Sequence, residues 1–235
     1  MISSLQITTP AKKCIFRCPF CISLGHSHNN IFRNLYEENF DEWRLKLIDV
    51  LISHPEIETC VITGTNEPMQ SPDFISAAVS IIKDLRPDIR TEIQTRFYKR
   101  HAIFKDLDIA CYSVSRYEDI IKIEESALTN RLVIILTDSF SGKTINDILE
   151  EIKGKNITQV TLKKLHTSNG VNPKMDSWIM QHSIAEDTYY HLKNEVANYD
   201  GPMSIRLDEN CMDAGNRYLI FREDGNIYKN WEMTS

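Results

Sequence analysis

Three cysteines, Cys14, Cys18 and Cys21, stand near the start of the chain with the spacing C-x3-C-x2-C. Thiolates this close in sequence can fold around one metal centre, as they do in zinc sites and iron–sulfur clusters. Three is an odd number for a closed site, because a structural zinc takes four protein ligands. Three thiolates on a [4Fe–4S] cluster leave one iron without a protein ligand, and chemistry can occur at that open iron.

A second candidate segment is residues 61–68, with the sequence VITGTNEP. Gly64 lets the backbone approach a ligand closely, because glycine has no Cβ. Glu67 supplies a carboxylate, which accepts hydrogen bonds from an ammonium group. The segment is therefore suited to holding a ligand that carries an amino group.

The elements that must position these residues alternate between short β-branched runs and amphipathic stretches, the pattern of a parallel α/β fold. A first strand over 4–9 leads directly into the cysteine loop, and a second over 58–63 leads to Gly64. The other predicted strands are 89–94, 109–114, 131–137 and 157–165. The predicted helices are 41–53, 72–85 and 144–153, with short helical segments near 98–104 and 118–126.

The pattern changes after residue 165. Residues 166–182 are predicted to be a loop, 184–197 a helix, 202–207 a strand and 217–228 a hairpin that turns at 223–226. About six β/α units precede this part. We therefore expect an open, partial (β/α)6 barrel over residues 1–165, with residues 166–235 packed on it as a short C-terminal extension.

The cysteine loop after a first strand, the aromatic Phe20 immediately before the third cysteine, and residues 61–68 together resemble the radical S-adenosylmethionine (radical SAM) superfamily. The resemblance implies that Cys14, Cys18 and Cys21 bind a [4Fe–4S] cluster whose fourth iron is chelated by SAM. Reduction then cleaves a carbon–sulfur bond of SAM and gives a 5′-deoxyadenosyl radical, which abstracts hydrogen from the substrate. An external one-electron donor such as flavodoxin or ferredoxin is also implied.

The resemblance assigns roles to individual residues. Phe20 matches the aromatic residue that packs near the adenine of SAM. Gly64 and Glu67 match the Gly-Gly-Glu-Pro element that holds the methionine amino group. This chain departs from that element, since Thr65 and Asn66 stand where a single glycine is usual.

Polar residues at the carboxyl ends of the strands are further candidates, because active sites of parallel barrels lie there. The resemblance implies a polar contact to the ribose or carboxylate of SAM on the third or fourth strand. We expect Gln94 and Ser113 to make it, with ordinary strand-end polarity as the alternative. Lys163 or Lys164 could meet a substrate carboxylate or phosphate, or could face solvent. Trp178 could close the site or serve in packing.

Composition narrows the class of protein. The formal net charge of −6, with both signs interspersed, disfavours broad nucleic-acid binding. No apolar run approaches the ~18 residues of a membrane span, and the N-terminus does not read as a signal peptide. The other cysteines, Cys60, Cys111 and Cys211, are widely separated, and we expect Cys60 and Cys111 to be buried core residues. A reducing cytoplasm is the expected compartment.

We expect an enzyme that cleaves SAM reductively and acts on a small-molecule or nucleotide substrate. A peptide- or protein-modifying enzyme, including a glycyl-radical activase, is the main alternative, and the acidic balance disfavours RNA modification. In another class, the chain could be a non-catalytic zinc- or cluster-binding protein, with His26 or His28 completing a zinc site. That alternative leaves Glu67 without a role.

Overall fold

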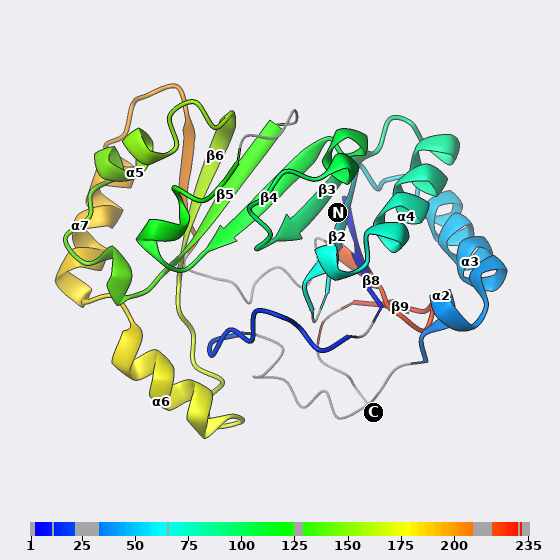
Figure 1. Cartoon of the computed structure of the whole chain (residues 1–235), viewed down its shortest axis with the longest axis horizontal. Coiled ribbons are helices and arrows are strands. Elements are labelled where there is room, and N and C mark those ends of the chain that lie inside the picture. The colour runs from blue at the N-terminus through cyan, green and yellow to red at the C-terminus, as the bar shows by residue number, and fades with distance from the viewer. Residues whose placement is uncertain are drawn as a thin grey trace.

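A computed structural model of the chain describes residues 3–10, 12–21, 33–64, 66–124, 129–208, 218–229 and 231. They form one nine-stranded sheet in the order β7-β6-β5-β4-β3-β2-β1-β8-β9 (Figure 1). Its edge strands β7 and β9 do not pair with each other in the described parts, so the barrel is open. Four residues named above lie outside the described residues: His26, His28, Thr65 and Cys211.

Six consecutive parallel strands make the partial barrel, and the predicted fold class is confirmed. They are β1 (Ser4–Thr8), β2 (Thr59–Thr63), β3 (Arg90–Thr95), β4 (Ile109–Val114), β5 (Thr129–Leu136) and β6 (Ile157–Lys164). Side chains alternate between the two faces of each strand. On β3, Ile93 faces the hydrophobic core, and its neighbours Glu92 and Gln94 point to the opposite face.

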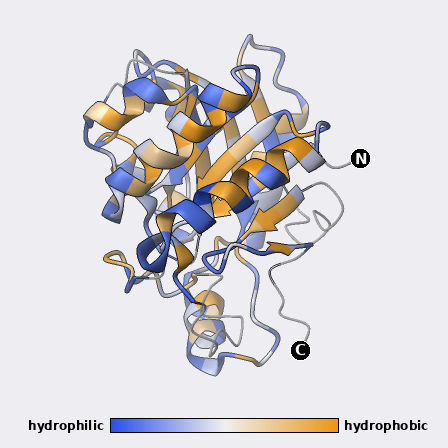
Figure 2. Ribbon diagram, turned by 90° about the vertical axis from the view of Figure 1, so that its right-hand side faces the viewer, coloured by the Kyte–Doolittle hydropathy of each residue, from blue (hydrophilic) through white to orange (hydrophobic). Residues whose placement is uncertain are grey.

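Helices cover the core-facing side of the sheet. The longer ones are α3 (Phe40–Ser53), α4 (Pro72–Leu85), α5 (Ile145–Glu151) and α7 (Glu186–Ala197), and α2 (Leu35–Glu38) is a single short turn. Helix α3 begins after Asn39, whose side chain accepts the Glu42 N–H. Trp43, Leu47 and Leu51 recur at helical spacing and are buried. Figure 2 shows hydrophobic strands covered by helices that carry both hydrophobic and hydrophilic residues.

The C-terminal residues add strands to both edges of the barrel sheet. Strand β7 (Ser204–Asp208) pairs with β6, and β8 (Tyr218–Phe221) pairs in parallel with β1. Strand β9 (Ile227–Tyr228) returns antiparallel to β8, which confirms the predicted hairpin. The strand that carries the cysteine loop is therefore held between β2 and β8.

One predicted loop is wrong. Within residues 166–182, helix α6 (Pro173–His182) forms, with Pro173 at its first position and the Asn172 side chain accepting the Met175 N–H. Met175 and Ile179 are buried at i, i+4 spacing, a stripe too narrow to give a strong helical signal in the sequence.

The short helical segments predicted near 98–104 and 118–126 are smaller than expected. Short 3-10 helices stand there instead, η2 (Ala102–Asp106) and η3 (Tyr117–Asp119). Two more, η1 (Pro68–Gln70) and η4 (Asp138–Phe140), follow β2 and β5. Long runs of 3-10 helix are uncommon because their hydrogen-bond geometry is poorer than that of an α-helix, which agrees with the small size of these elements.

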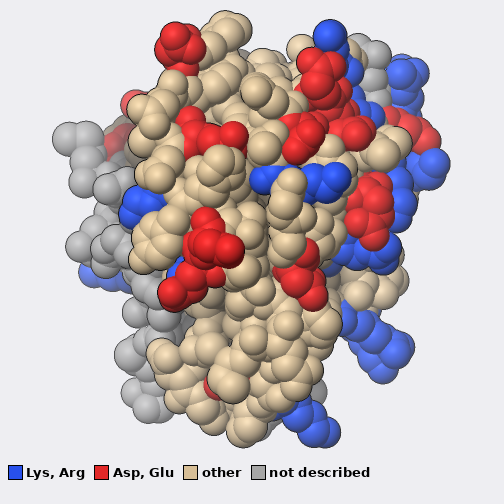
Figure 3. Space-filling model, turned by 90° about the vertical axis from the view of Figure 1, so that its left-hand side faces the viewer, with Lys and Arg blue, Asp and Glu red and all other residues tan. Residues whose placement is uncertain are grey.

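Acidic and basic side chains are interspersed on the face that carries α5 and α7 (Figure 3). Neither sign dominates that face among the residues drawn in colour. No helix within the described residues is long and apolar enough to span a membrane.

Candidate active site

The cysteine loop follows β1, so it lies at the carboxyl end of the barrel strands. Cys14, Cys18 and Cys21 are all half-buried, and the Cys21 N–H donates to the Cys18 carbonyl at 3.1 Å. Burial raises the pKa of the Cys18 thiol, Arg96 opposes that shift, and the nearby Cys21 and Cys14 thiols raise it further. Cys14 and Cys21 are therefore near enough to Cys18 to affect the charge on its sulfur.

No three Cys, His, Asp or Glu side chains in the described ranges are close enough to form a finished metal site. The donor set nevertheless fits a [4Fe–4S] cluster with one open iron, because soft thiolates are the ligands of such clusters and the loop offers three. A closed zinc site needs a fourth ligand, which this loop does not supply among its described residues.

The segment after β2 fastens the cysteine loop in place. Gln70, in η1, accepts the Ile15 N–H at 3.1 Å and donates its amide N–H to the Lys13 carbonyl at 3.1 Å. Both contacts flank Cys14 directly. The cysteine loop and the segment after β2, which the resemblance assigns to the same site, are therefore joined by hydrogen bonds.

Asn66, where the chain departs from the usual glycine, has a structural role. Its side-chain amide donates to the Pro10 carbonyl at 2.6 Å, and its side-chain oxygen accepts from the Thr9 hydroxyl. Gly64 has φ +151°, and a Cβ there would lie 3.1 Å from Thr9 Oγ1 and 3.2 Å from Thr9 N. Glycine is therefore required for the close approach of the β1 and β2 ends.

Glu67 is buried, with only 4% of its surface exposed. Its Oε1 accepts from the Thr95 hydroxyl and from the Met69 N–H, and its Oε2 accepts the Arg96 N–H at 2.9 Å. Burial raises the pKa of Glu67, and these donors oppose the shift. A carboxylate has about four acceptor positions, so room for one further donor remains.

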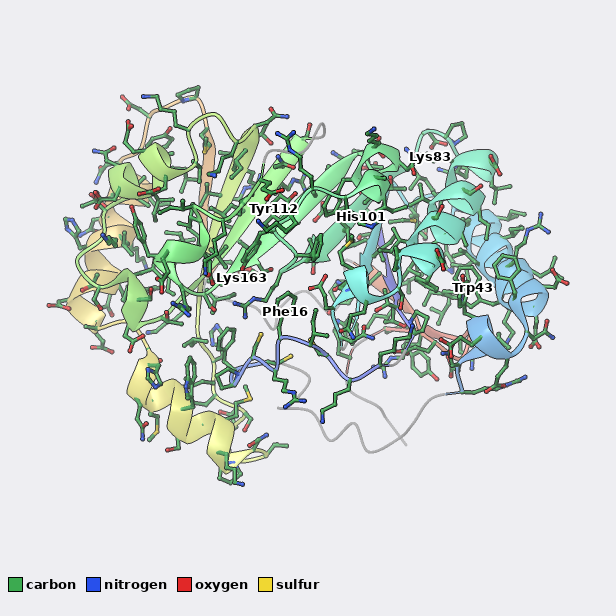
Figure 4. The ribbon with its side chains drawn as sticks, viewed as in Figure 1. Phe16, Trp43, Lys83, His101, Tyr112 and Lys163 are labelled. Atoms are coloured by element: carbon green, nitrogen blue, oxygen red, sulfur yellow. The ribbon has the colours of Figure 1, made fainter. Side chains whose placement is uncertain are left out.

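Arg96 is a candidate site residue that the sequence did not single out. Its guanidinium donates to Cys18 Sγ at 2.7 Å and to Ser115 Oγ at 3.1 Å, and lies 5.6 Å from the centre of the Phe16 ring. Figure 4 shows Phe16 and Lys163 near the end of the sheet where the cysteine loop runs, with Trp43 far away among the helices. The one available signal was the position of Arg96 just after β3, at the carboxyl end of the strand.

Phe20 packs against α6. Its ring centre lies 5.3 Å from that of Trp178, which stacks on His182 at 4.4 Å. His182 Nδ1 in turn lies 2.9 Å from a carboxylate oxygen of Asp138. Helix α6, which the sequence did not predict, therefore borders the cysteine loop through aromatic contacts.

Gln94 and Ser113 lie on the same face of neighbouring strands, the face away from the core. Gln94 is exposed, and its side-chain oxygen accepts from the Thr63 hydroxyl at 3.3 Å. The Ser113 side chain is half-buried, and its carbonyl accepts from the Tyr98 hydroxyl at 2.8 Å. Their assignment to ribose or carboxylate binding stays a prediction.

Two ion pairs also lie on that face. Arg131 pairs with the buried Glu92 at 2.7 Å. Lys163 on β6 pairs with Asp208 on β7 at 3.2 Å. Lys164 points the other way and lies 4.7 Å from the Tyr189 ring of α7.

The remaining described cysteines are buried, Cys60 in the hydrophobic core and Cys111 on the opposite face of the sheet. Burial raises the pKa of the Cys60 thiol to about 12 and raises that of Cys111 as well. Neither thiol is therefore suited to binding a metal as a thiolate.

No protein-family model matches the sequence, and no curated protein does. Among solved structures, Streptococcus suis SuiB bound to S-adenosylmethionine superposes with a TM-score of 0.61 at 11% identity, covering 98% of this chain and 60% of SuiB. SuiB bound to its precursor peptide SuiA gives the same TM-score at 10% identity, with 97% and 60% coverage. The chain has the radical SAM fold.

The chain spans 60% of the length of SuiB, so the activity of the larger protein does not follow from the likeness. BtrN in complex with AdoMet and 2-DOIA gives a TM-score of only 0.39 at 8% identity, covering 98% of this chain and 73% of BtrN. A TM-score this low supports no argument from BtrN.

Proposed function

We propose that this chain is a radical SAM enzyme that binds a [4Fe–4S] cluster through Cys14, Cys18 and Cys21. The observation that supports this most is that Gln70, three residues after Glu67, makes two hydrogen bonds to the backbone on either side of Cys14. These bonds join the cysteine loop to the segment that contains Glu67 (the Glu67 segment, residues 66–70), within a radical SAM fold. The cluster, when bound, supplies the electron that cleaves the carbon–sulfur bond of SAM and gives the 5′-deoxyadenosyl radical.

The chain's own residues would bind and orient SAM. The Glu67 carboxylate would accept from the methionine ammonium, since burial strengthens a charge-assisted hydrogen bond. Phe20 would offer an aromatic face to the adenine, supported from behind by Trp178. Gln94 and Ser113 remain the proposed polar contacts to the ribose or carboxylate.

A small-molecule or nucleotide substrate is our first choice. The face of the sheet next to the cysteine loop carries polar and charged side chains, including Lys163 with Asp208. Such groups suit a small polar ligand, because a charged group of the ligand can replace one partner of an ion pair. We also propose an external electron donor, flavodoxin or ferredoxin, and a reducing cytoplasm as the setting.

A peptide substrate is the second candidate. SuiB, which shares the fold, has been solved with a precursor peptide bound. The two proposals separate in a substrate search, because a peptide that is modified by this chain in the presence of SAM and reductant would favour the second.

The test is anaerobic reconstitution of the full chain, followed by dithionite, SAM and chromatographic measurement of 5′-deoxyadenosine. We expect about four irons per chain and 5′-deoxyadenosine that depends on both protein and reductant. The Cys18→Ala variant should lose the cluster, whereas Cys60→Ala, a matched change at a buried thiol, should retain it. Zinc at one equivalent without iron, or an intact [4Fe–4S] signal in Cys18→Ala, would refute the proposal.

A further inference from the structure

Arg96 lies where the cysteine loop and the Glu67 segment meet. Its side chain donates to Cys18 Sγ, and its backbone N–H donates to the Glu67 carboxylate. One residue therefore touches a proposed cluster ligand and the proposed SAM-binding carboxylate. Its side chain is only 21% exposed, so water screens the guanidinium weakly.

The guanidinium is held in this position from several sides. One nitrogen donates to Ser115 Oγ at 3.1 Å and lies 3.7 Å from Asp119 Oδ2. Its buried Nε has no hydrogen-bond partner within the described residues. Asp119 also pairs with Lys122, at the shorter distance of 2.7 Å, so it neutralises Arg96 only in part.

The neighbouring cations differ from Arg96 in their exposure and in their contacts. Lys12, Lys13 and Arg17 of the cysteine loop are exposed, and Arg116 is 60% exposed and bound to Glu118. No described contact joins any of them to a cysteine sulfur. Arg96 is thus the cation that the described geometry brings into hydrogen-bond contact with the cysteine loop's sulfur.

We propose that Arg96 is a positioning residue that raises the reduction potential of the [4Fe–4S] cluster through its hydrogen bond to the Cys18 sulfur. This inference rests on the proposed function. The cluster takes up one electron from its donor, and the reduced state carries one more negative charge. A hydrogen bond and a positive charge at a ligand sulfur stabilise that state more than the oxidised one, which makes reduction easier.

The test is a redox titration of the reconstituted full chain without SAM, followed by electron paramagnetic resonance. In Arg96→Gln, we expect the ratio of reduced to oxidised cluster at a fixed potential to fall about tenfold, equivalent to about 59 mV for a one-electron couple. Arg96→Lys keeps the charge but not the planar fork, so its shift should be smaller. Arg116→Gln removes an equal charge nearby without touching a sulfur, and should titrate as the wild type does.

Two results would overturn the inference: a wild-type potential in Arg96→Gln, or an equal shift in Arg116→Gln, which would assign the effect to net charge alone. If Arg96→Gln assembles no cluster, Ser115→Ala decides, because it removes the acceptor that orients the guanidinium. A shift in the same direction supports the inference, and no shift refutes it. A wild-type chain that takes up no iron would instead refute the proposed function itself, and this inference with it.

Discussion

Glu67 joins two tasks in one side chain. As a buried acceptor it fixes the end of β3, through Thr95 and Arg96, to the turn that begins η1. As a carboxylate with an acceptor position left, it can bind the ammonium of a ligand. Truncation to alanine would leave buried donors unsatisfied, so an effect on folding would accompany any effect on binding.

Glu67→Gln removes the charge and nearly keeps the shape. Its amide oxygen can still accept from Thr95 and Met69, but its NH2 group would face the Arg96 N–H, so the stability of the variant is measured beside its affinity. We expect SAM affinity to fall roughly 10- to 100-fold, since a hydrogen bond to a charged group contributes about 1.5–3 kcal/mol. Titration calorimetry on the reconstituted protein measures this, with Glu124→Gln, at an exposed carboxylate paired with Lys99, as the control. Equal affinity in wild type and Glu67→Gln would show that the methionine contact lies elsewhere.

The same site predicts a pH dependence. Burial raises the pKa of Glu67, so this carboxylate takes up a proton at a higher pH than an ordinary glutamate does. Protonation removes the negative charge that attracts the ammonium. SAM affinity in the wild type should therefore decline as pH falls, starting at a higher pH than an ordinary glutamate would give, and the decline should be absent in Glu67→Gln. A parallel decline in both proteins would assign it to another group.

The sequence singled out residues whose chemistry is visible in their type and spacing, namely the three cysteines, Phe20 and Glu67, and their roles stay predictions. It missed Thr95 and Arg96, because their contacts are long-range: each is far in sequence from the partner that it meets. Neither a threonine nor an arginine at a strand end is unusual by itself. Only the pairing of β3 with β2 reveals that these side chains reach the site.

At the scale of elements, η1 holds the cysteine loop through the hydrogen bonds of Gln70. Gln70→Ala removes two hydrogen bonds beside Cys14, each worth about 0.5–1.5 kcal/mol. The loop should open more often, and iron should pass to a chelator several-fold faster from the reconstituted protein. Gln181→Ala, on an exposed position of α6, makes the same chemical change without a contact to the loop. Equal rates of iron loss in the two variants would show that the Gln70 hydrogen bonds do not help to retain the cluster.

The strands and the long helices follow from local patterns, and most were predicted within a few residues. Helix α4 was predicted with its observed bounds, because Pro72 marks its start and a broad apolar stripe continues to its end. Helix α6 was not predicted, since much of what holds it is tertiary: Trp178 packs on Phe20, more than a hundred residues earlier in the chain. Such contacts leave no periodic trace in the sequence.

At the scale of the whole molecule, the C-terminal residues are bound into the barrel rather than appended to it. Strand β8 pairs with β1, and Phe221 of β8 packs 6.1 Å from Trp43 of α3. The Glu223 carbonyl accepts the Leu35 N–H at the start of α2. We therefore propose that residues 1–165 and 166–235 form one cooperative unit.

Unfolding in urea tests this proposal. Fluorescence and far-ultraviolet circular dichroism should report one coincident transition, because strands from both parts share one sheet. Trp43→Ala should lower the free energy of unfolding by about 3–5 kcal/mol, since Trp43 is 1% exposed and its ring packs against α4 and β8. Leu45→Ala, at a side chain 63% exposed on the same helix, should change it by only about 0.5 kcal/mol. Two separate transitions in the wild type would mean that the C-terminal part folds as a domain of its own, and the cysteine loop would then not depend on β8 for its position.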